Sequence, residues 1–190
     1  MNALPQTAQP WVTEAEYLAY CEAHPEEKFE LIDGEIVAMA GASRNHNLIT
    51  GNIFALMRPH LRNSGCFVFA SDWKVKVEYN FYYPDIVVDC DSDDNQPRLI
   101  VEVLSESTKN IDLSIKLEDY QKIPSLQEYV VVEQSAKFIL VYRKKALWKG
   151  QIYQDGDIYL ESIDLTLSVA DIYDEVVFKT RNLKIVSKQS

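Results

Sequence analysis

The fold is constrained most strongly by two apolar runs near the middle of the chain, PDIVVDC (84–90) and RLIVEVL (98–104). Both have the length and the β-branched content of buried strands. In the second run, apolar residues occupy both faces, which is typical of a central strand that is covered on both sides. Each run nevertheless carries an acid, Asp85 or Glu102, where an apolar residue would be expected. The pattern therefore predicts two carboxylates within one sheet.

Two buried carboxylates that lie close together need a compensating positive charge. A buried carboxylate costs several kcal/mol unless it is neutralised, and two close together repel and raise at least one pKa. A divalent cation removes both costs, and hard oxygen ligands suit Mg²⁺ or Mn²⁺. If the two strands are neighbours, Asp85 and Glu102 form a candidate metal site. The alternative is a glutamate on an edge strand that faces solvent or pairs with a basic residue, and the spacing alone leaves this open.

A lysine on the next element favours the metal site. Residues 111–122 have the apolar spacing of a helix, and Lys116 borders its packed face. Because this helix directly follows the strand of Glu102, the ammonium of Lys116 could reach the carboxylates or a bound phosphate. The other interpretation is a surface pair with Asp112, worth a few tenths of a kcal/mol.

The remaining patterns give the outline of the fold. Thr13 and Glu16 form a capping box that predicts a helix to about residue 23, and Asp33-Gly34 predicts a hairpin in FELIDGEIVAMA (29–40). We expect a further helix at 43–62, strands at 66–70, 73–79, 128–134, 137–144, 148–154 and 157–163, and a helical turn within 165–173. This order predicts an α/β (mixed α+β) fold in which helices flank a central mixed β-sheet.

Length and composition predict one domain, at 11–178, between a flexible tail at 1–10 and a C-terminal tail at 179–190. No apolar run approaches the roughly 20 residues that span a bilayer, and the N-terminus lacks the pattern of a signal peptide. We therefore expect a cytoplasmic protein without a membrane partner. The three cysteines, Cys21, Cys66 and Cys90, are widely spaced and odd in number, which favours reduced thiols.

The net charge of −10 opposes binding to a polyanion such as nucleic acid. Four aspartates, Asp89, Asp91, Asp93 and Asp94, crowd one connection and are expected to form a solvated loop. A nucleic-acid partner would need a local basic surface. Lys74 and Lys76 supply one candidate stripe on strand 73–79, although such lysines are more often solvated surface charges.

The ordered motifs resemble those of a known family. Pro84-Asp85, followed by Glu102-Val103-Leu104, resembles the PD-(D/E)XK nuclease signature. PRLIVEVLSEST, the helix pattern D-x3-K-x3-Y and EYVVVE extend this likeness to the Uma family of restriction-endonuclease-like proteins, formerly a domain of unknown function. The hairpin at 29–40 and the helix opening SRNHNLI also look like that family, so the resemblance covers about residues 13–175.

The resemblance implies a restriction-endonuclease-like fold and a set of site residues. Asp85, Glu102 and the backbone carbonyl of Val103 would bind Mg²⁺, or Mn²⁺ in its place. The lysine of the signature would fall at position 104, which is Leu104 here. Lys116 on the following helix would be its replacement and the third catalytic residue.

Three accessory residues are also implied. His46 matches the family's histidine position, although a histidine at a helix start that shares a face with Ile49 and Ile53 is more often structural. Glu35, just after the hairpin turn, could approach the site or remain a solvated carboxylate. Tyr120 belongs to the same helical pattern as Lys116.

The resemblance implies a metal-dependent endonuclease that hydrolyses phosphodiester bonds, with DNA as the expected substrate and a homodimer as the expected assembly. Leu104 and the acidic charge favour an alternative, a catalytically weak or inactive nuclease-like module that binds DNA or a protein partner. A hydrolase of RNA or of a small phosphate ester is a third interpretation. The sequence has no zinc-ligand spacing, no glycine-rich phosphate loop and no G-x-S-x-G, which disfavours zinc, P-loop and serine hydrolases.

Overall fold

A computed structural model describes residues 11–39, 41–90, 96–105 and 108–178. The tails predicted at 1–10 and 179–190 lie outside the described residues, and so do Asp91, Asp93 and Asp94 of the predicted acidic loop. Asp89, expected in the same solvated loop, is instead buried as the last residue of the strand Ile86–Asp89. Within the described ranges, no helix combines the length and the apolar character needed to cross a bilayer.

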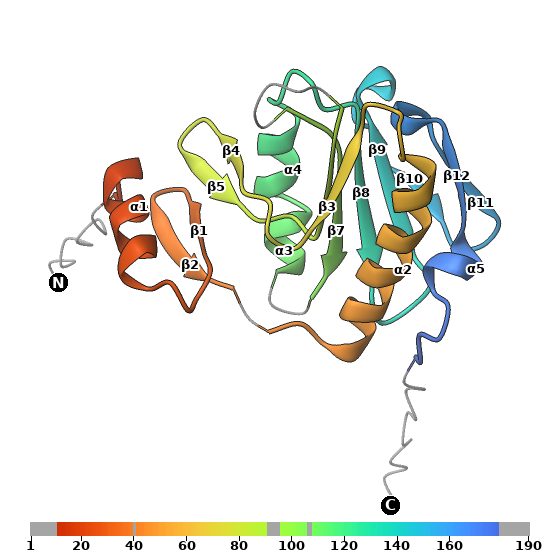
Figure 1. The fold of residues 1–190 in the computed structure, drawn as a ribbon, viewed down its shortest axis with the longest axis horizontal. Helices are drawn as coiled ribbons and strands as arrows, with labels where there is room; N and C mark the ends of the chain where they lie inside the picture. The colour runs from red at the N-terminus through yellow and green to blue at the C-terminus, as the bar shows by residue number, and fades with distance from the viewer. Residues whose placement is uncertain (1–10, 40, 91–95, 106–107, 179–190) are drawn as a thin grey trace, which may run out of the picture.

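A six-stranded mixed sheet forms the centre of the molecule, with the strand order β10-β9-β8-β7-β6-β3 (Figure 1). Strands β7 and β8 run parallel, and every other neighbouring pair in this sheet is antiparallel. The predicted central mixed sheet is thus confirmed, with β6 and β7 side by side in its interior. The strands are β3 Phe67–Ala70, β6 Ile86–Asp89, β7 Pro97–Leu104, β8 Glu128–Glu133, β9 Ile139–Arg143 and β10 Gln151–Tyr153.

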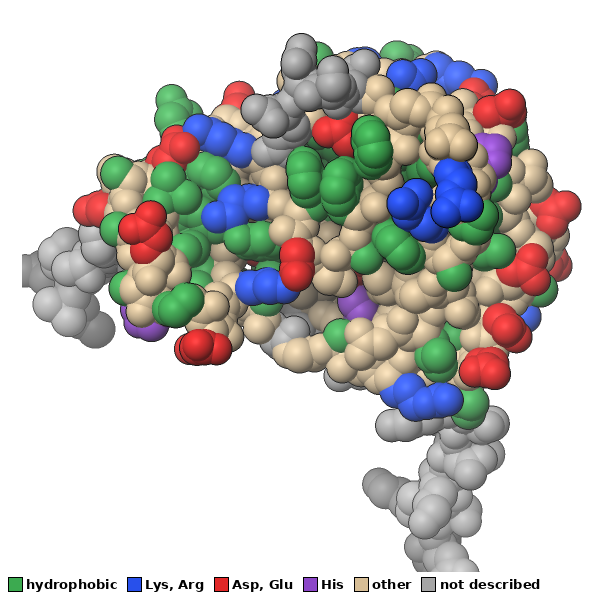
Figure 2. Space-filling view, viewed as in Figure 1, with side chains coloured by type: hydrophobic (Ala, Val, Ile, Leu, Met, Phe, Trp, Pro, Cys, Tyr) green, Lys and Arg blue, Asp and Glu red, His purple; other side chains and the backbone are tan. Residues whose placement is uncertain are grey.

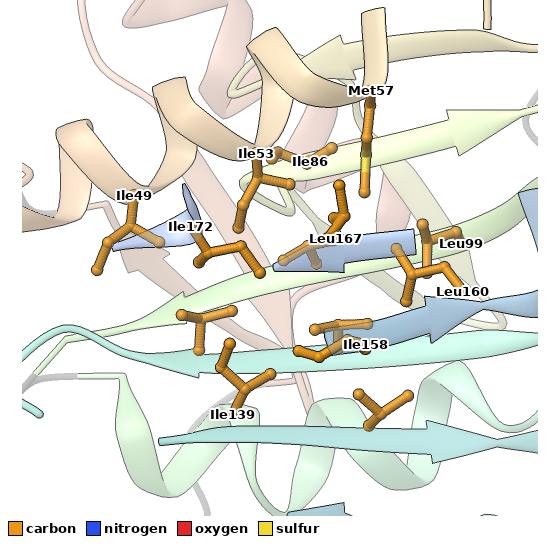
Figure 3. Close-up of a cluster of buried hydrophobic side chains, with 14 of the residues drawn as sticks. Ile49, Ile53, Met57, Ile86, Leu99, Ile139, Ile158, Leu160, Leu167 and Ile172 are labelled. Carbon is orange, nitrogen blue, oxygen red and sulfur yellow. The ribbon is translucent and has the colours of Figure 1, made fainter. Parts of the chain in front are cut away.

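Helix α2 (Arg44–His60) covers one face of this sheet. Its apolar residues recur at helical spacing, and Figure 3 shows Ile49, Ile53 and Met57 pointing from the helix toward the strands. Each such side chain contributes roughly 1.5–3 kcal/mol when fully buried. The same face is closed by β11 (Asp157–Leu160), β12 (Leu165–Ser168) and α5 (Val169–Ile172), and two short 3₁₀ turns occupy Lys144–Ala146 and Glu161–Ile163.

The other face of the sheet carries the crossover between the parallel strands β7 and β8. The sequence predicts one helix at 111–122, but the structure has two shorter helices, α3 (Lys109–Asp112) and α4 (Ile115–Tyr120). Ser114 lies at the break, and its hydroxyl donates to the carbonyl of Asn110 one turn earlier. A serine that bonds back to the i−4 carbonyl competes with helix continuation, which accounts for the difference.

A second, four-stranded sheet has the order β2-β1-β5-β4 and joins the N-terminal part to this face. Its strands are β1 (Phe29–Ile32), β2 (Glu35–Ala38), β4 (Val75–Val77) and β5 (Asn80–Tyr82). Helix α1 (Glu14–Ala23) begins at the predicted capping box and packs on this sheet. The hairpin turn at Asp33-Gly34 has positive φ at both residues, as predicted. The sequence prediction of a single strand at 73–79 misses β5. Glu78 adopts a left-handed conformation, and the chain turns back there.

The expected state of the cysteines is wrong for two of the three. Cys66 and Cys90 form a disulfide, whereas Cys21 is free. The reason is the antiparallel pairing of β3 with β6, in which Phe67 faces Asp89, so that Cys66 just before β3 lies opposite Cys90 just after β6. Spacing along the chain does not reveal this cross-strand contact.

Candidate active site

The two acids of the signature meet where β6 begins. The pairing of Ile86 with Val101 sets Asp85 beside Glu102, and the Asp85 N–H donates to Glu102 Oε2 at 3.4 Å. Oδ2 of Asp85 accepts from the backbone N–H of Val103 at 2.7 Å. Glu102 is 4% exposed, so it has lost most of its hydration, as the two-sided apolar pattern of its strand predicts. The structure therefore brings Asp85, Glu102 and the Val103 backbone together.

Lys116 joins this pair from α4. Its Nζ lies 3.1 Å from Glu102 Oε1, 3.0 Å from Glu30 Oε1 and 3.3 Å from Asp112 Oδ1. Lys116 is 3% exposed, so its pairing with Asp112 is buried and is not the surface pair considered above. Tyr120, one turn further along α4, donates its hydroxyl to the same Glu102 oxygen at 3.0 Å. Glu102 is thus the carboxylate on which Lys116 and Tyr120 converge.

Sequence reasoning missed Glu30 as a member of this cluster and treated Asp112 only as a surface partner. Glu30 lies in the middle of β1, where all four residues are buried. An acid within an apolar strand is the signal that singled out Glu102, and the run FELI carries the same signal.

Of the predicted accessory residues, His46 contacts the cluster within the described ranges and Glu35 does not. His46 Nε2 lies 3.1 Å from Asp85 Oδ2, and its Nδ1 is buried without a hydrogen-bond partner among the described residues. Burial alone would lower the pKa of His46, but the hydrogen bond with Asp85 raises it above its usual value. Glu35 is exposed on β2, and no hydrogen bond or ion pair in the described part of the chain joins it to the cluster.

Negative charge exceeds positive charge in the cluster. Burial raises the pKa of Glu102 well above its ordinary value, and repulsion from Asp112, Asp85 and Glu30 adds to the effect despite the attraction of Lys116. Burial alone would lower the pKa of Lys116, but its three carboxylate partners raise it well above its usual value. The lysine is therefore held as an ammonium within an excess of carboxylates.

This donor set fits a hard divalent cation. Asp85 and Glu102 would supply two carboxylates and Val103 a carbonyl, and Mg²⁺ commonly completes such a set with water. The buried excess of carboxylates favours the binding of additional positive charge. Asp112 Oδ1 adds to this excess, because it is buried 3.3 Å from Lys116 Nζ and has no hydrogen bond of its own within the described part of the chain. No group of three or more His, Cys, Asp or Glu side chains in the described ranges could hold a metal by side chains alone. A metal here would depend on the backbone carbonyl and on water.

Leu104 and the two candidate DNA-binding lysines, Lys74 and Lys76, all contact other side chains of the protein. Leu104 is 3% exposed and packs in the apolar cluster between the sheet and α4. Lys76 pairs with Glu14 at 2.7 Å, and Lys74 lies 5.1 Å from the ring centre of Tyr17. Figure 2 shows Lys and Arg side chains in separate small groups on the face in view, without one continuous basic strip.

The central sheet, its helices, Asp85 just before β6 and Glu102 of β7 define the class of the protein, a restriction-endonuclease-like α/β fold. The fold matches a crystal structure from Anabaena variabilis, described as "a putative nuclease belonging to DUF820", with a TM-score of 0.73. The match covers 87% of this chain and 99% of that chain at 17% sequence identity, so it establishes the fold alone.

Residues 14–170 match the Uma2 family, described as "Putative restriction endonuclease", and the chain belongs to this family. Two uncharacterized proteins of Synechocystis are similar along most of their length. One, slr1290, is 35% identical over 186 residues, covering 92% of this chain and 97% of the relative. The other, sll1609, is 36% identical over 144 residues, covering 70% and 81%. The resemblance read from the sequence motifs is confirmed.

Proposed function

We propose that the protein is a metal-dependent endonuclease that hydrolyses phosphodiester bonds in DNA, with Mg²⁺ or Mn²⁺ as cofactor. The observation that carries the proposal is the meeting of Asp85, Glu102 and Lys116 in a nuclease-like fold, with Lys116 Nζ 3.1 Å from Glu102. Because cleavage of both strands needs two sites, the proposal includes a homodimer. A cytoplasmic location, expected from the sequence, is also part of it.

The residues of the cluster have separable roles in this proposal. Asp85, Glu102 and the Val103 carbonyl would hold the metal, which when bound lowers the pKa of a water and offsets charge on the phosphate. Lys116 and Tyr120 hold Glu102 in place through their contacts with Oε1. Lys116 is 3% exposed, so it would act on Glu102 and on a metal-bound water rather than by reaching out to the DNA backbone.

His46 contacts Asp85, and 13% of its side chain is exposed, compared with 4% of the Lys116 side chain. The histidine lies in the first turn of α2, and its contact with Oδ2 orients the Asp85 carboxylate. We assign it an accessory role in holding Asp85. Lys74 and Lys76 remain candidates for backbone contacts, and any such contact by Lys76 would have to displace Glu14.

Cleavage of several nucleic acids tests the proposal directly. We expect the wild-type protein to cut supercoiled, linear or single-stranded DNA with Mg²⁺ or Mn²⁺ and to be inactive in EDTA. Asp85→Asn should lower the rate by at least about 100-fold, since it removes a metal ligand. The matched control is Asp72→Asn, because Asp72 is exposed and its contact is with Lys28. Equal cutting by the wild-type and Asp85→Asn proteins would end the proposal.

A second candidate is a nuclease-like module that binds DNA or a protein partner without cutting. The observation that favours it is Leu104, which fills the position of the signature lysine with a buried apolar side chain. Metal-linked stability separates the two functions. Mg²⁺ should raise the melting temperature of an intact metal site, whereas a module without that site would show no shift. RNA added as a substrate in the cleavage assay tests the third interpretation.

A further inference from the structure

Glu30 is the acid of the cluster that lies outside the nuclease signature. It is 5% exposed and sits on β1 of the N-terminal hairpin. Phe29 and Leu31 face the apolar cluster beneath α1, whereas Ile32 packs in the cluster shared with α4. Since alternate residues of a strand share a face, Glu30 points with Ile32 toward α4.

One oxygen of Glu30 makes two contacts. Oε1 lies 3.0 Å from Lys116 Nζ and accepts the backbone N–H of Tyr83 at 2.9 Å. Tyr83 directly precedes the Pro84-Asp85 pair at the start of β6. Glu30 therefore links the hairpin to both sides of the candidate site, the ammonium on α4 and the chain that leads to Asp85.

The N–H of Tyr83 does not require a charge. A neutral glutamine could accept this hydrogen bond, and it would avoid the several kcal/mol that a buried carboxylate costs. What a glutamine could not supply is a negative charge against the buried ammonium of Lys116. The charge on Glu30 is thus explained by the lysine rather than by the hairpin.

The other partners of Lys116 show why this charge matters. Glu102 is in the proposed metal donor set, so a bound cation competes with the lysine for its charge. Glu30 and Asp112 contact Lys116 at 3.0 and 3.3 Å and are not in that donor set. They remain available to the ammonium when Glu102 is engaged.

We propose that Glu30 is a positioning residue of the active site, which together with Asp112 keeps the Lys116 ammonium fixed against Glu102 while Glu102 serves the metal. The inference rests on the proposed function. It makes the N-terminal hairpin a part of the catalytic unit, although it lies far from the signature in the sequence.

Glu30→Gln tests the inference because it removes the charge and keeps the shape and the acceptor for Tyr83. We expect kcat for DNA cleavage to fall by about 10- to 100-fold, as is usual for residues that orient groups around a metal site. KM for DNA and the Mg²⁺-induced rise in melting temperature should stay close to their wild-type values, because neither the DNA surface nor the metal donors change. A merely structural role would instead lower the melting temperature and leave kcat of the folded protein unaltered.

Glu27→Gln is the matched control on the same segment. Glu27 is exposed, and no ion pair within the described residues involves it, so kcat should not change. Wild-type kcat in Glu30→Gln, or a change in KM alone, would overturn this inference and leave the proposed function intact. An inactive wild-type protein would overturn the proposed function, and the positioning role with it.

Asp112→Asn keeps the inference testable should Glu30→Gln fold poorly. It removes the second carboxylate from Lys116 without touching the hairpin, and the contact of Tyr129 is with the Asp112 backbone carbonyl, which stays. We expect the same loss of kcat with unchanged KM. An Asp112→Asn protein with the wild-type kcat would show that Asp112 does not help to fix the ammonium, which would overturn the shared positioning role.

Discussion

At the scale of single residues, Glu102 carries the strongest conflict between stability and proposed function. It is almost completely buried, and burial with three neighbouring carboxylates raises its pKa. Tyr120 and Lys116 donate to its Oε1 and the Asp85 N–H donates to its Oε2, and a glutamine oxygen could still accept from Tyr120 and Lys116. The negative charge itself is therefore the feature that favours a metal and disfavours the metal-free fold.

We predict that Glu102→Gln is more stable than the wild type in EDTA, by about 1 kcal/mol, because one of four crowded carboxylates is removed. In a protein of this size that is a rise of roughly 2–4 °C in melting temperature. Differential scanning fluorimetry in EDTA and in Mg²⁺ measures both states, with Glu27→Gln as the unchanged reference. A lower melting temperature in EDTA would mean that the charge of Glu102 stabilises the metal-free fold.

A second residue-scale prediction concerns Asp119 on α4, which accepts from Asn80 at 2.6 Å, from Lys122 at 2.7 Å and from the Tyr82 hydroxyl. Burial alone would raise the pKa of Asp119, but these hydrogen bonds lower it below its usual value. A lowered carboxyl pKa contributes stability above the unfolded pKa of about 4, and this contribution is lost as the pH falls through the folded pKa.

Asp119→Asn should therefore cost about 2 kcal/mol at pH 7, the usual scale for hydrogen bonds to a charged group. The difference from the wild type should shrink as the pH is lowered from about 4, because the wild type loses the same charge. Urea unfolding at a series of pH values measures this difference. A gap that stays constant down to acid pH would show that the charge of Asp119 is not what stabilises this contact.

At the scale of elements, the sequence predicts best where local chemistry decides. The capping box of α1, the Asp33-Gly34 hairpin and the apolar spacing of α2 all rest on contacts between near neighbours, and all are found. The two strands of the signature are also found, since a run that is apolar on both faces must be buried on both faces.

The elements that the sequence mispredicts depend on less regular contacts. The break at Ser114 follows from one side-chain bond to Asn110, and strand β5 follows from a turn at Glu78 without glycine or proline. The disulfide of Cys66 with Cys90 and the contact of Glu30 with Lys116 join segments that are distant in sequence. Propensity and spacing do not reveal such contacts. The pairing of Asp85 with Glu102 is different, because each acid stands out within an apolar run of the sequence.

At the scale of the whole molecule, charge governs how the protein would meet DNA. The net charge is −10, and several lysines on the described surface are already paired with acids, as Lys76 is with Glu14 and Lys122 with Glu78. Phosphate repulsion should therefore be strong until a divalent cation is bound. The metal would serve association as well as chemistry.

We predict weak binding of an uncleavable phosphorothioate duplex in EDTA and an affinity at least about tenfold higher in Mg²⁺, because the cation offsets the buried excess of carboxylates. Fluorescence anisotropy measures both, and Glu102→Gln should lose most of the gain. The logarithm of the affinity in Mg²⁺ should fall linearly with the logarithm of the salt concentration. A flat salt response would argue against phosphate contacts.

The contact between β1 and α4 has a practical consequence for anyone who shortens or fuses this chain. A fragment that starts at α2 would retain Asp85, Glu102 and Lys116 and would satisfy a search for the PD-(D/E)XK signature, yet the ammonium would have lost its Glu30 partner. A fragment chosen by the motif alone would thus contain all the signature residues but lack the carboxylate of Glu30 that contacts Lys116. Expression boundaries for this protein should begin before Phe29, and preferably before α1, whose Tyr17 hydroxyl donates to the Phe29 carbonyl.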